Sequence, residues 1–166
     1  MKIGIYISPA HSVPQNDPHI LAPWIIVHNL VDNLIKRGHI VYLFAASESK
    51  TKASLFHDNI SATISKQSSM SKKDYKEFVI EAERKLCKYM FSIVNKEKID
   101  IVHIHQPIER LYPSLRVKPL NLPLVFTFHD PIIPKRYKEL IKVNNLPSVY
   151  FVSLSNAQRI GAPIPF

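Results

Sequence analysis

The sequence predicts an α/β protein with a Rossmann-like parallel sheet of about six strands, flanked by helices. Short runs rich in Val, Ile and Phe alternate with longer segments of helical periodicity, as expected when helices join parallel strands. These runs show little alternation of apolar and polar residues, which is typical of strands covered on both faces. Strands are expected at Lys2–Ile7, Ile40–Ala45, Ile60–Ile64 (the weakest), Ile99–Ile104, Leu124–Phe128 and Val149–Leu154.

The first helix is expected from about Trp24 to Arg37. Its apolar residues keep to one broad face. Gly38 follows where a left-handed cap is needed, so we expect the helix to end there. The residues of that apolar face are Ile26, Leu30, Val31, Leu34 and Ile35.

The longest helix is expected from Ser71 to about Asn95, after a polar loop at Ser65–Ser71. Ser71 with Asp74 forms a variant of the capping box. Apolar residues then recur every three or four positions, which indicates core packing, and Cys87 beside them is expected to be packed rather than reactive. These apolar residues are Tyr75, Phe78, Val79, Ala82, Leu86, Met90 and Ile93.

Length and composition predict a single soluble domain spanning residues 1–166. Apolar residues make up 46% of the 166 residues and charged residues 21%, which is ordinary for globular proteins. The single cysteine favours a reducing cytoplasm. No segment resembles a signal peptide, and no apolar run approaches the roughly 18 residues of a membrane span.

The formal charge of +9 is spread over the chain, with small clusters of Lys and Arg. A solvated basic surface explains much of it. No nucleic-acid-binding motif accompanies the charge, so nucleic acid is not the expected partner. Such an excess also suits peripheral contact with an anionic membrane surface, or a phosphorylated small molecule. The clusters lie at Lys72, Lys73 and Lys76, at Arg84, Lys85 and Lys88, and at Lys135, Arg136 and Lys138.

Polar side chains follow four of the expected strands, and three of these strands have a histidine at or soon after the end. In an open parallel sheet, ligands bind beyond the carboxyl ends of the strands, where the strand order reverses. We therefore expect these residues to surround one cleft. They are Ser8 and His11, His105 and Gln106, His129 and Asp130, and Ser155 and Gln158.

His129 is the strongest catalytic candidate among them. A neutral imidazole can donate to a phosphate or a hydroxyl, and a protonated one adds charge stabilisation. The helix beginning near Trp24 offers free backbone N–H groups at the same edge, which suits a diphosphate. His103 and His39 are expected to be structural. A zinc site formed by His103, His105, His129 and Asp130 is the less favoured alternative.

Five segments in order resemble the N-terminal domain of retaining GT-B glycosyltransferases of the family-four type. The segments are MKIGIYISP, LIKRGHIVYLFAASESK, IDIVHIHQP, LPLVFTFHDP and VSLSNAQR, and they span nearly the whole chain. The resemblance implies a Rossmann-like domain that holds mainly the acceptor. It also implies a second, C-terminal domain that binds the nucleotide sugar and is absent from this chain.

Carried over by position, the resemblance implies that His129 reaches the donor sugar near the reacting centre. His105 would line the cleft, Ser155 and Gln158 would border it, and the loop from Ser8 to Asn16 would lie on the acceptor side. The donor substrate would be a nucleoside diphosphate sugar, with no metal and no further cofactor.

The family usually has a Gly-Gly turn before the first helix, and this chain has Leu21-Ala22-Pro23-Trp24 there. Pro23 lacks an N–H, and Leu21 and Trp24 add bulk, so closer contact with phosphate is disfavoured. The chain also shows no pair of glutamates eight residues apart of the kind that holds the donor.

These observations predict the acceptor-side half of a hexosyltransferase of carbohydrate biosynthesis, inactive alone and completed by a donor domain in cis or in a partner subunit. A lipid-linked or sugar acceptor would place it at the cytoplasmic membrane face. The alternative is a non-catalytic module that binds a sugar, a lipid or a partner.

Overall fold

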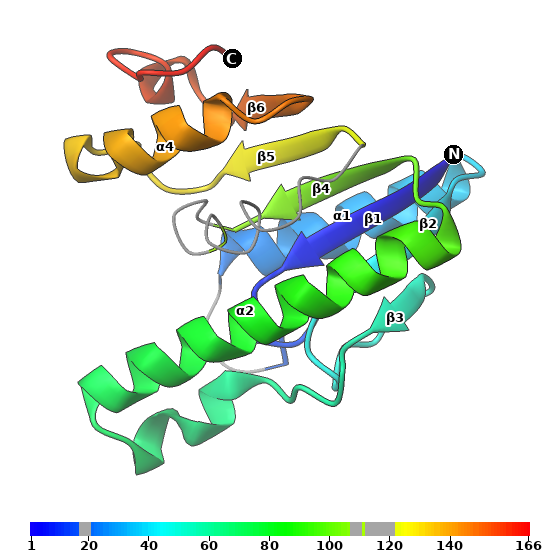
Figure 1. Ribbon diagram of the computed structural model, residues 1–166. Coiled ribbons are helices and arrows are strands. Elements are labelled where there is room, and N and C mark those ends of the chain that lie inside the picture. Colours follow the sequence, from blue (N-terminus) through cyan, green and yellow to red (C-terminus); the bar gives the residue numbers. More distant parts are fainter. Residues whose placement is uncertain (17–20, 107–110, 112–121) are drawn as a thin grey trace.

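Six parallel strands form one sheet in the computed structural model, which describes residues 1–16, 21–106, 111 and 122–166 (Figure 1). The strand order is β3-β2-β1-β4-β5-β6, and every neighbouring pair is parallel. The predicted α/β class, the parallel sheet and its number of strands are therefore confirmed. The strands are β1 (Lys2–Ile7), β2 (Ile40–Phe44), β3 (Ser54–Phe56), β4 (Ile101–His105), β5 (Leu124–Phe128) and β6 (Val149–Ser153).

Helices cover the sheet on both faces. Helix α1 packs on one face, while α2 and α4 lie on the other (Figure 1). None of the helices among the described residues is long and apolar enough to cross a membrane. The helices are α1 (Ala22–Lys36), α2 (Lys72–Glu97) and α4 (Tyr137–Asn144), with short 3₁₀ helices η1 (Thr63–Ser69), η2 (Pro134–Arg136) and η3 (Asn156–Gln158).

Helix α1 ends as its sequence predicts. Gly38 has a φ of 81°, and its N–H donates to Ile35 while the N–H of His39 donates to Leu34. This pair of hydrogen bonds is the Schellman arrangement, which needs a left-handed residue at Gly38. The helix begins at Ala22, slightly earlier than expected.

The buried face of α1 differs in part from the expected one. Val27 and Val31 are buried against β1 and β2, whereas Ile26 is 36% exposed. The apolar period alone did not decide between the adjacent Ile26 and Val27, because both belong to the same broad stripe.

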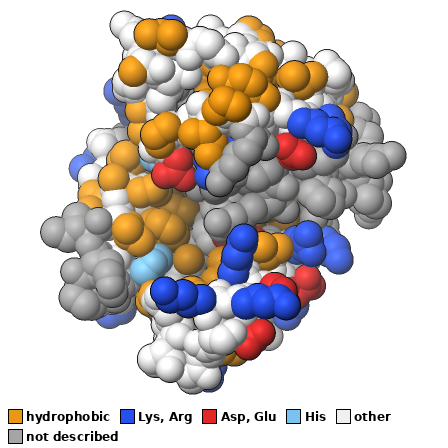
Figure 2. Space-filling model, turned by 90° about the vertical axis from the view of Figure 1, so that its left-hand side faces the viewer, with side chains coloured by type: hydrophobic (Ala, Val, Ile, Leu, Met, Phe, Trp, Pro, Cys, Tyr) orange, Lys and Arg blue, Asp and Glu red, His pale blue; other side chains and the backbone are white. Residues whose placement is uncertain are grey.

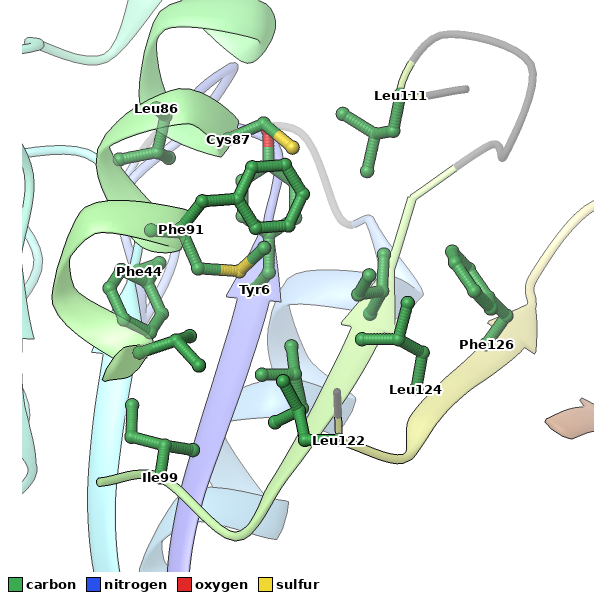
Figure 3. Packing of buried hydrophobic residues seen from close by; sticks show 14 of the residues in the cluster. Tyr6, Phe44, Leu86, Cys87, Phe91, Ile99, Leu111, Leu122, Leu124 and Phe126 are labelled. Carbon is green, nitrogen blue, oxygen red and sulfur yellow. The ribbon is translucent and has the colours of Figure 1, made fainter. Parts of the chain in front are cut away.

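Helix α2 carries the larger core. Its first turn is capped by Ser71, whose hydroxyl accepts from the backbone N–H of Asp74, as the capping-box interpretation predicts. Leu86 and Phe91 point from α2 toward Tyr6 and Phe44 of the sheet (Figure 3). Cys87 is buried beside them, as expected, while Phe78 of the predicted stripe is 38% exposed.

The strand expected at Ile60–Ile64 is wrong. The third strand is Ser54–Phe56, and the expected loop at Ser65–Ser71 lies largely within η1. Ile60 is buried because its loop packs against the core, and its carbonyl accepts from the N–H of Ser47. The apolar residues that suggested a strand thus belong to a packed loop.

The last two elements also differ from the expectation. Helix α4 was not predicted between Pro134 and Pro147, and it buries only Leu140 and Val143. Strand β6 is covered on one face only. Tyr150 is 57% exposed because no described element packs on its side of this edge strand.

The sheet order creates a switch point between β1 and β4. The chain leaves β1 toward β2 on one side, whereas β4 continues to β5 on the other side. Loops therefore diverge between the carboxyl ends of these adjacent strands, which leaves room for a ligand.

Candidate functional site

A cavity of about 280 Å³ lies at the switch point, on the edge of the sheet where the strands end. Figure 2 views the molecule from the side to which the strand arrows of Figure 1 point, and it shows apolar side chains gathered near the middle of that face. The lining comes from six parts of the chain. It comprises Ser8, Ala10, Leu21, Pro23, Trp24, Glu83, His105, Gln106, Thr127, Phe128, His129, Asp130 and Arg136.

Two of the cavity histidines are hydrogen-bonded to each other. The Nδ1 atom of His105 lies 2.9 Å from the Nε2 atom of His129. His105 is the last residue of β4, and His129 directly follows β5, so the pairing of these neighbouring strands brings the two rings together. The two segments are separated by 24 positions in the sequence.

Both rings are held neutral by their surroundings. Burial lowers the pKa of His129, and only the nearby Asp130 acts in the opposite direction. Burial lowers the pKa of His105 well below its usual value, and repulsion from His103 and His129 adds to this effect. A neutral imidazole has one N–H donor and one acceptor nitrogen.

The pair leaves two ring nitrogens without a partner among the described residues. Both the Nε2 atom of His105 and the Nδ1 atom of His129 are buried and make no hydrogen bond there. Whichever ring donates to the other, one of these two nitrogens carries a proton and the other is a bare acceptor. The pair therefore has one unused donor and one unused acceptor among the described residues.

His103 forms a layer beneath this pair. Its ring centroid lies 4.1 Å from that of His105, and its Nε2 atom lies 2.7 Å from the hydroxyl oxygen of Thr127. Burial, with a smaller contribution from the charge of His129, lowers the pKa of His103 to about 4. The ring is half-buried with its Nε2 atom hydrogen-bonded, as expected for a structural histidine.

Glu83 of α2 is a wall residue that the sequence interpretation missed. Its side chain is fully buried, and its Oε1 atom accepts from the hydroxyl of Ser8 at 2.7 Å and from the amide of Gln106 at 2.6 Å. The spacing to Val79 and Leu86 places Glu83 on the inward face of α2. That spacing is the signal in the sequence, although an acidic residue in a highly charged helix ordinarily faces solvent.

The first loop packs against the start of α1. His11 is buried and meets the ring of Trp24 edge to face, with ring centroids 4.8 Å apart. The indole N–H of Trp24 donates to the carbonyl of Ser8 at 3.3 Å. Ser8 and Trp24 line the cavity, whereas His11 supports Trp24 from outside the lining.

The residues at the outer rim are less buried. The carboxylate of Asp130 is exposed and lies 3.9 Å from the guanidinium of Arg136, and both residues line the cavity. Ser155 is exposed and does not line it. Gln158 does not line it either, but it accepts from the N–H of Leu154 and donates to the carbonyls of Phe128 and Asp130.

The structure thus brings Ser8, His105, Gln106, His129 and Asp130 to one cavity, with Gln158 holding the loop that carries His129. Within residues 1–16, 21–106, 111 and 122–166, no three His, Cys, Asp or Glu side chains gather as a metal site would require.

Residues 25–163 match the model of glycosyltransferase family 4. This chain belongs to that family. No curated protein matches it significantly. The family 4 match runs from within α1 to the segment after η3, and therefore includes His105, His129 and most of the cavity wall.

Proposed function

We propose that this family 4 domain is the acceptor side of a transferase that moves a hexose from a nucleoside diphosphate sugar to an acceptor with retention. The observation that supports this most is the pair His105–His129, buried in the wall of a cavity at the switch point of the sheet. A neutral pair with one N–H and one bare nitrogen suits the hydroxyls of a sugar and the oxygens of a diphosphate.

His129 is the proposed catalytic residue. Its N–H would donate to a hydroxyl of the donor sugar beside the reacting carbon. The acceptor hydroxyl attacks the anomeric carbon from the side on which the diphosphate leaves, which retains the configuration. The bond to the acceptor oxygen forms as the bond to the phosphate oxygen breaks, and the hydroxyl proton passes to the leaving phosphate. The amino-terminal end of α1, whose first residues line the cavity, favours negative charge at that point.

The acceptor is proposed to lie against the loop after β1 and the ends of β4 and β5. Ser8, Gln106 and Asp130 supply polar groups on that wall, while His11 fixes Trp24. Ser155 and Gln158 border the site on the β6 side. The nucleotide would be held by a second domain, present in cis or in a partner subunit, so the chain alone would not complete the reaction.

The test is a His129→Ala substitution in the protein assembled with its donor domain. We expect turnover to fall on the order of 100-fold, while the melting temperature changes little. His39→Ala, at a half-buried histidine outside the cavity, is the matched control and should keep full turnover. Equal turnover of the His129→Ala variant and the wild type would falsify the assignment of the site.

One observation favours a second function, a non-catalytic sugar-, lipid- or partner-binding module. At the start of α1, Pro23 has no N–H, and the N–H of Leu21 is already donated to the side chain of Gln15 at 3.0 Å. Together with the bulk of Trp24, this reduces the groups that can approach a diphosphate. Sugar binding without transfer by the assembled protein would support this second function.

An anionic membrane surface is the proposed place of contact for a lipid-linked acceptor. Several Lys and Arg side chains lie in the lower half of the view in Figure 2, the side on which Figure 1 shows η1 and the start of α2. Lys72 and Lys76 are exposed on the first turns of α2, with Met70 and Phe78 partly exposed beside them in sequence. Basic and apolar side chains together are what binding to anionic lipid requires.

A further inference from the structure

Glu83 occupies a place where helix packing alone would favour an apolar side chain. Its neighbours on the inward face of α2, Val79, Leu86 and Met90, are all buried and apolar. Among the described residues, Glu83 is the only Asp, Glu, Lys or Arg with a buried side chain. Burying a carboxylate is costly, so it is retained where its hydrogen bonds serve a purpose that leucine or methionine cannot.

The hydrogen bonds of Glu83 join two adjacent strand ends. Ser8 follows β1 and Gln106 follows β4, and both donate to the same carboxylate oxygen. The backbone carbonyl of Glu83 accepts a further hydrogen bond from the hydroxyl of Tyr6 at 2.8 Å. One turn of α2 therefore fixes both sides of the switch point.

The carboxylate also decides how the amide of Gln106 is turned. A carboxylate only accepts hydrogen bonds, so Gln106 must direct its NH₂ group toward Glu83. The carbonyl oxygen Oε1 of Gln106 is then on the opposite side of the amide. Gln106 is buried and lines the cavity.

We propose that Glu83 is a positioning residue that orients Gln106 so that its Oε1 atom accepts a hydrogen bond from a hydroxyl of the acceptor sugar. This inference rests on the proposed function, since it takes the cavity to be a sugar site. The hydroxyl of Ser8 has a different part. It donates to Glu83 and accepts from the N–H of Ala10 at 3.2 Å, so it shapes the loop.

A charge exchange within the pair tests the proposal. Glu83→Gln has the same shape but lets either amide turn around, so Gln106 no longer has one forced orientation. In the double variant Glu83→Gln with Gln106→Glu, residue 83 supplies the NH₂ group, and the carboxylate at 106 keeps one oxygen for the sugar. Glu77→Gln, an exposed glutamate on the same helix, is the matched control.

The affinity of each variant for methyl α-D-glucopyranoside and methyl α-D-mannopyranoside is measured by NMR titration, alongside thermal unfolding. We expect Glu83→Gln to bind roughly tenfold more weakly, the double variant to recover most of the affinity, and Glu77→Gln to match the wild type. A merely structural role of Glu83 would lower stability without this pattern of loss and recovery.

Wild-type affinity in Glu83→Gln, or no recovery in the double variant, overturns the proposal for Glu83. If Glu83→Gln does not fold, Gln106→Met replaces it, since it removes the acceptor oxygen and leaves Glu83 in place; wild-type affinity there also overturns the proposal. A wild-type protein that binds neither glycoside contradicts the proposed sugar site itself, and the inference about Glu83 fails with it.

Discussion

The Nδ1 atom of His105 lies 2.9 Å from the Nε2 atom of His129, so the catalytic candidate is held by a neighbour on the adjacent strand. The bond engages the Nε2 atom of His129, whereas its Nδ1 atom is buried and makes no hydrogen bond among the described residues. The orientation of His129 therefore depends on the side chain at position 105.

Replacement of His105 should affect turnover through His129. We expect His105→Leu to slow transfer about tenfold or more, because the ring of His129 loses its partner. His105→Asn, whose amide can occupy the place of Nδ1, should recover much of the loss. Combining His105→Leu with His129→Ala should add little to His129→Ala alone. Turnover numbers of the assembled protein check this, and fully additive losses would contradict the coupling.

The stability of the domain should fall as the pH falls from 6.5 to about 4. His103 is neutral in the folded state until its pKa of about 4, whereas the unfolded chain takes up a proton near pH 6.5. The unfolded state thus binds more protons in this window. The difference between the two pKa values of His103 corresponds to about 3 kcal/mol in the free energy of unfolding. The stability that the neutral His103 provides is complete above pH 6.5, and it is lost as the pH falls through about 4.

Urea unfolding at several pH values between 7 and 4.5 measures this effect. The variant His103→Gln keeps an amide near the hydroxyl of Thr127 but cannot titrate there. Its unfolding free energy should depend less steeply on pH than that of the wild type. Identical slopes for the two proteins would show that His103 is not a source of the dependence.

A backbone donor restored at the start of α1 should improve phosphate binding. Pro23→Ala adds an N–H in the first turn of the helix, beside the cavity. We expect the affinity for inorganic pyrophosphate to rise roughly fivefold, since one hydrogen bond to a charged group is gained. Pro134→Ala, at the first position of η2 and outside the lining, is the control. The affinities are measured by calorimetric titration with pyrophosphate. Equal affinities of the wild type and Pro23→Ala would contradict phosphate binding at the start of α1.

Binding to anionic vesicles should depend on the start of α2. Lys72→Glu with Lys76→Glu should abolish most sedimentation with vesicles of phosphatidylserine and phosphatidylcholine, because each basic residue near such a surface contributes about 1 kcal/mol. Lys138→Glu with Lys142→Glu changes the charge equally at the same spacing on α4, which Figure 1 shows beside β5 and β6, away from the start of α2. Equal losses for both pairs would indicate an effect of net charge alone.

Much of the fold followed from local pattern. Five of the six strands are short runs rich in Val, Ile and Phe, and α1 and α2 carry clear end signals in Gly38 and Ser71. Strand β3 has only three residues, which is too short for a period. Helix α4 has one short apolar face between prolines, so neither length nor pattern distinguished it from a connection.

The candidate site was predictable where it depended on the edge of the sheet. Parallel strands end on one side, so residues following β1, β4 and β5 could be grouped before their distances were known. Glu83 could not be found by that rule because it reaches the site from the middle of a helix. The direct bond between His105 and His129 depends on the register of β4 and β5, which single strands do not reveal.

Gln158 connects the segment after β6 to the loop after β5. Its side chain accepts from the N–H of Leu154 and donates to the carbonyls of Phe128 and Asp130, the residues on either side of His129. A displacement of residues 154–158 would therefore also displace the loop that carries His129.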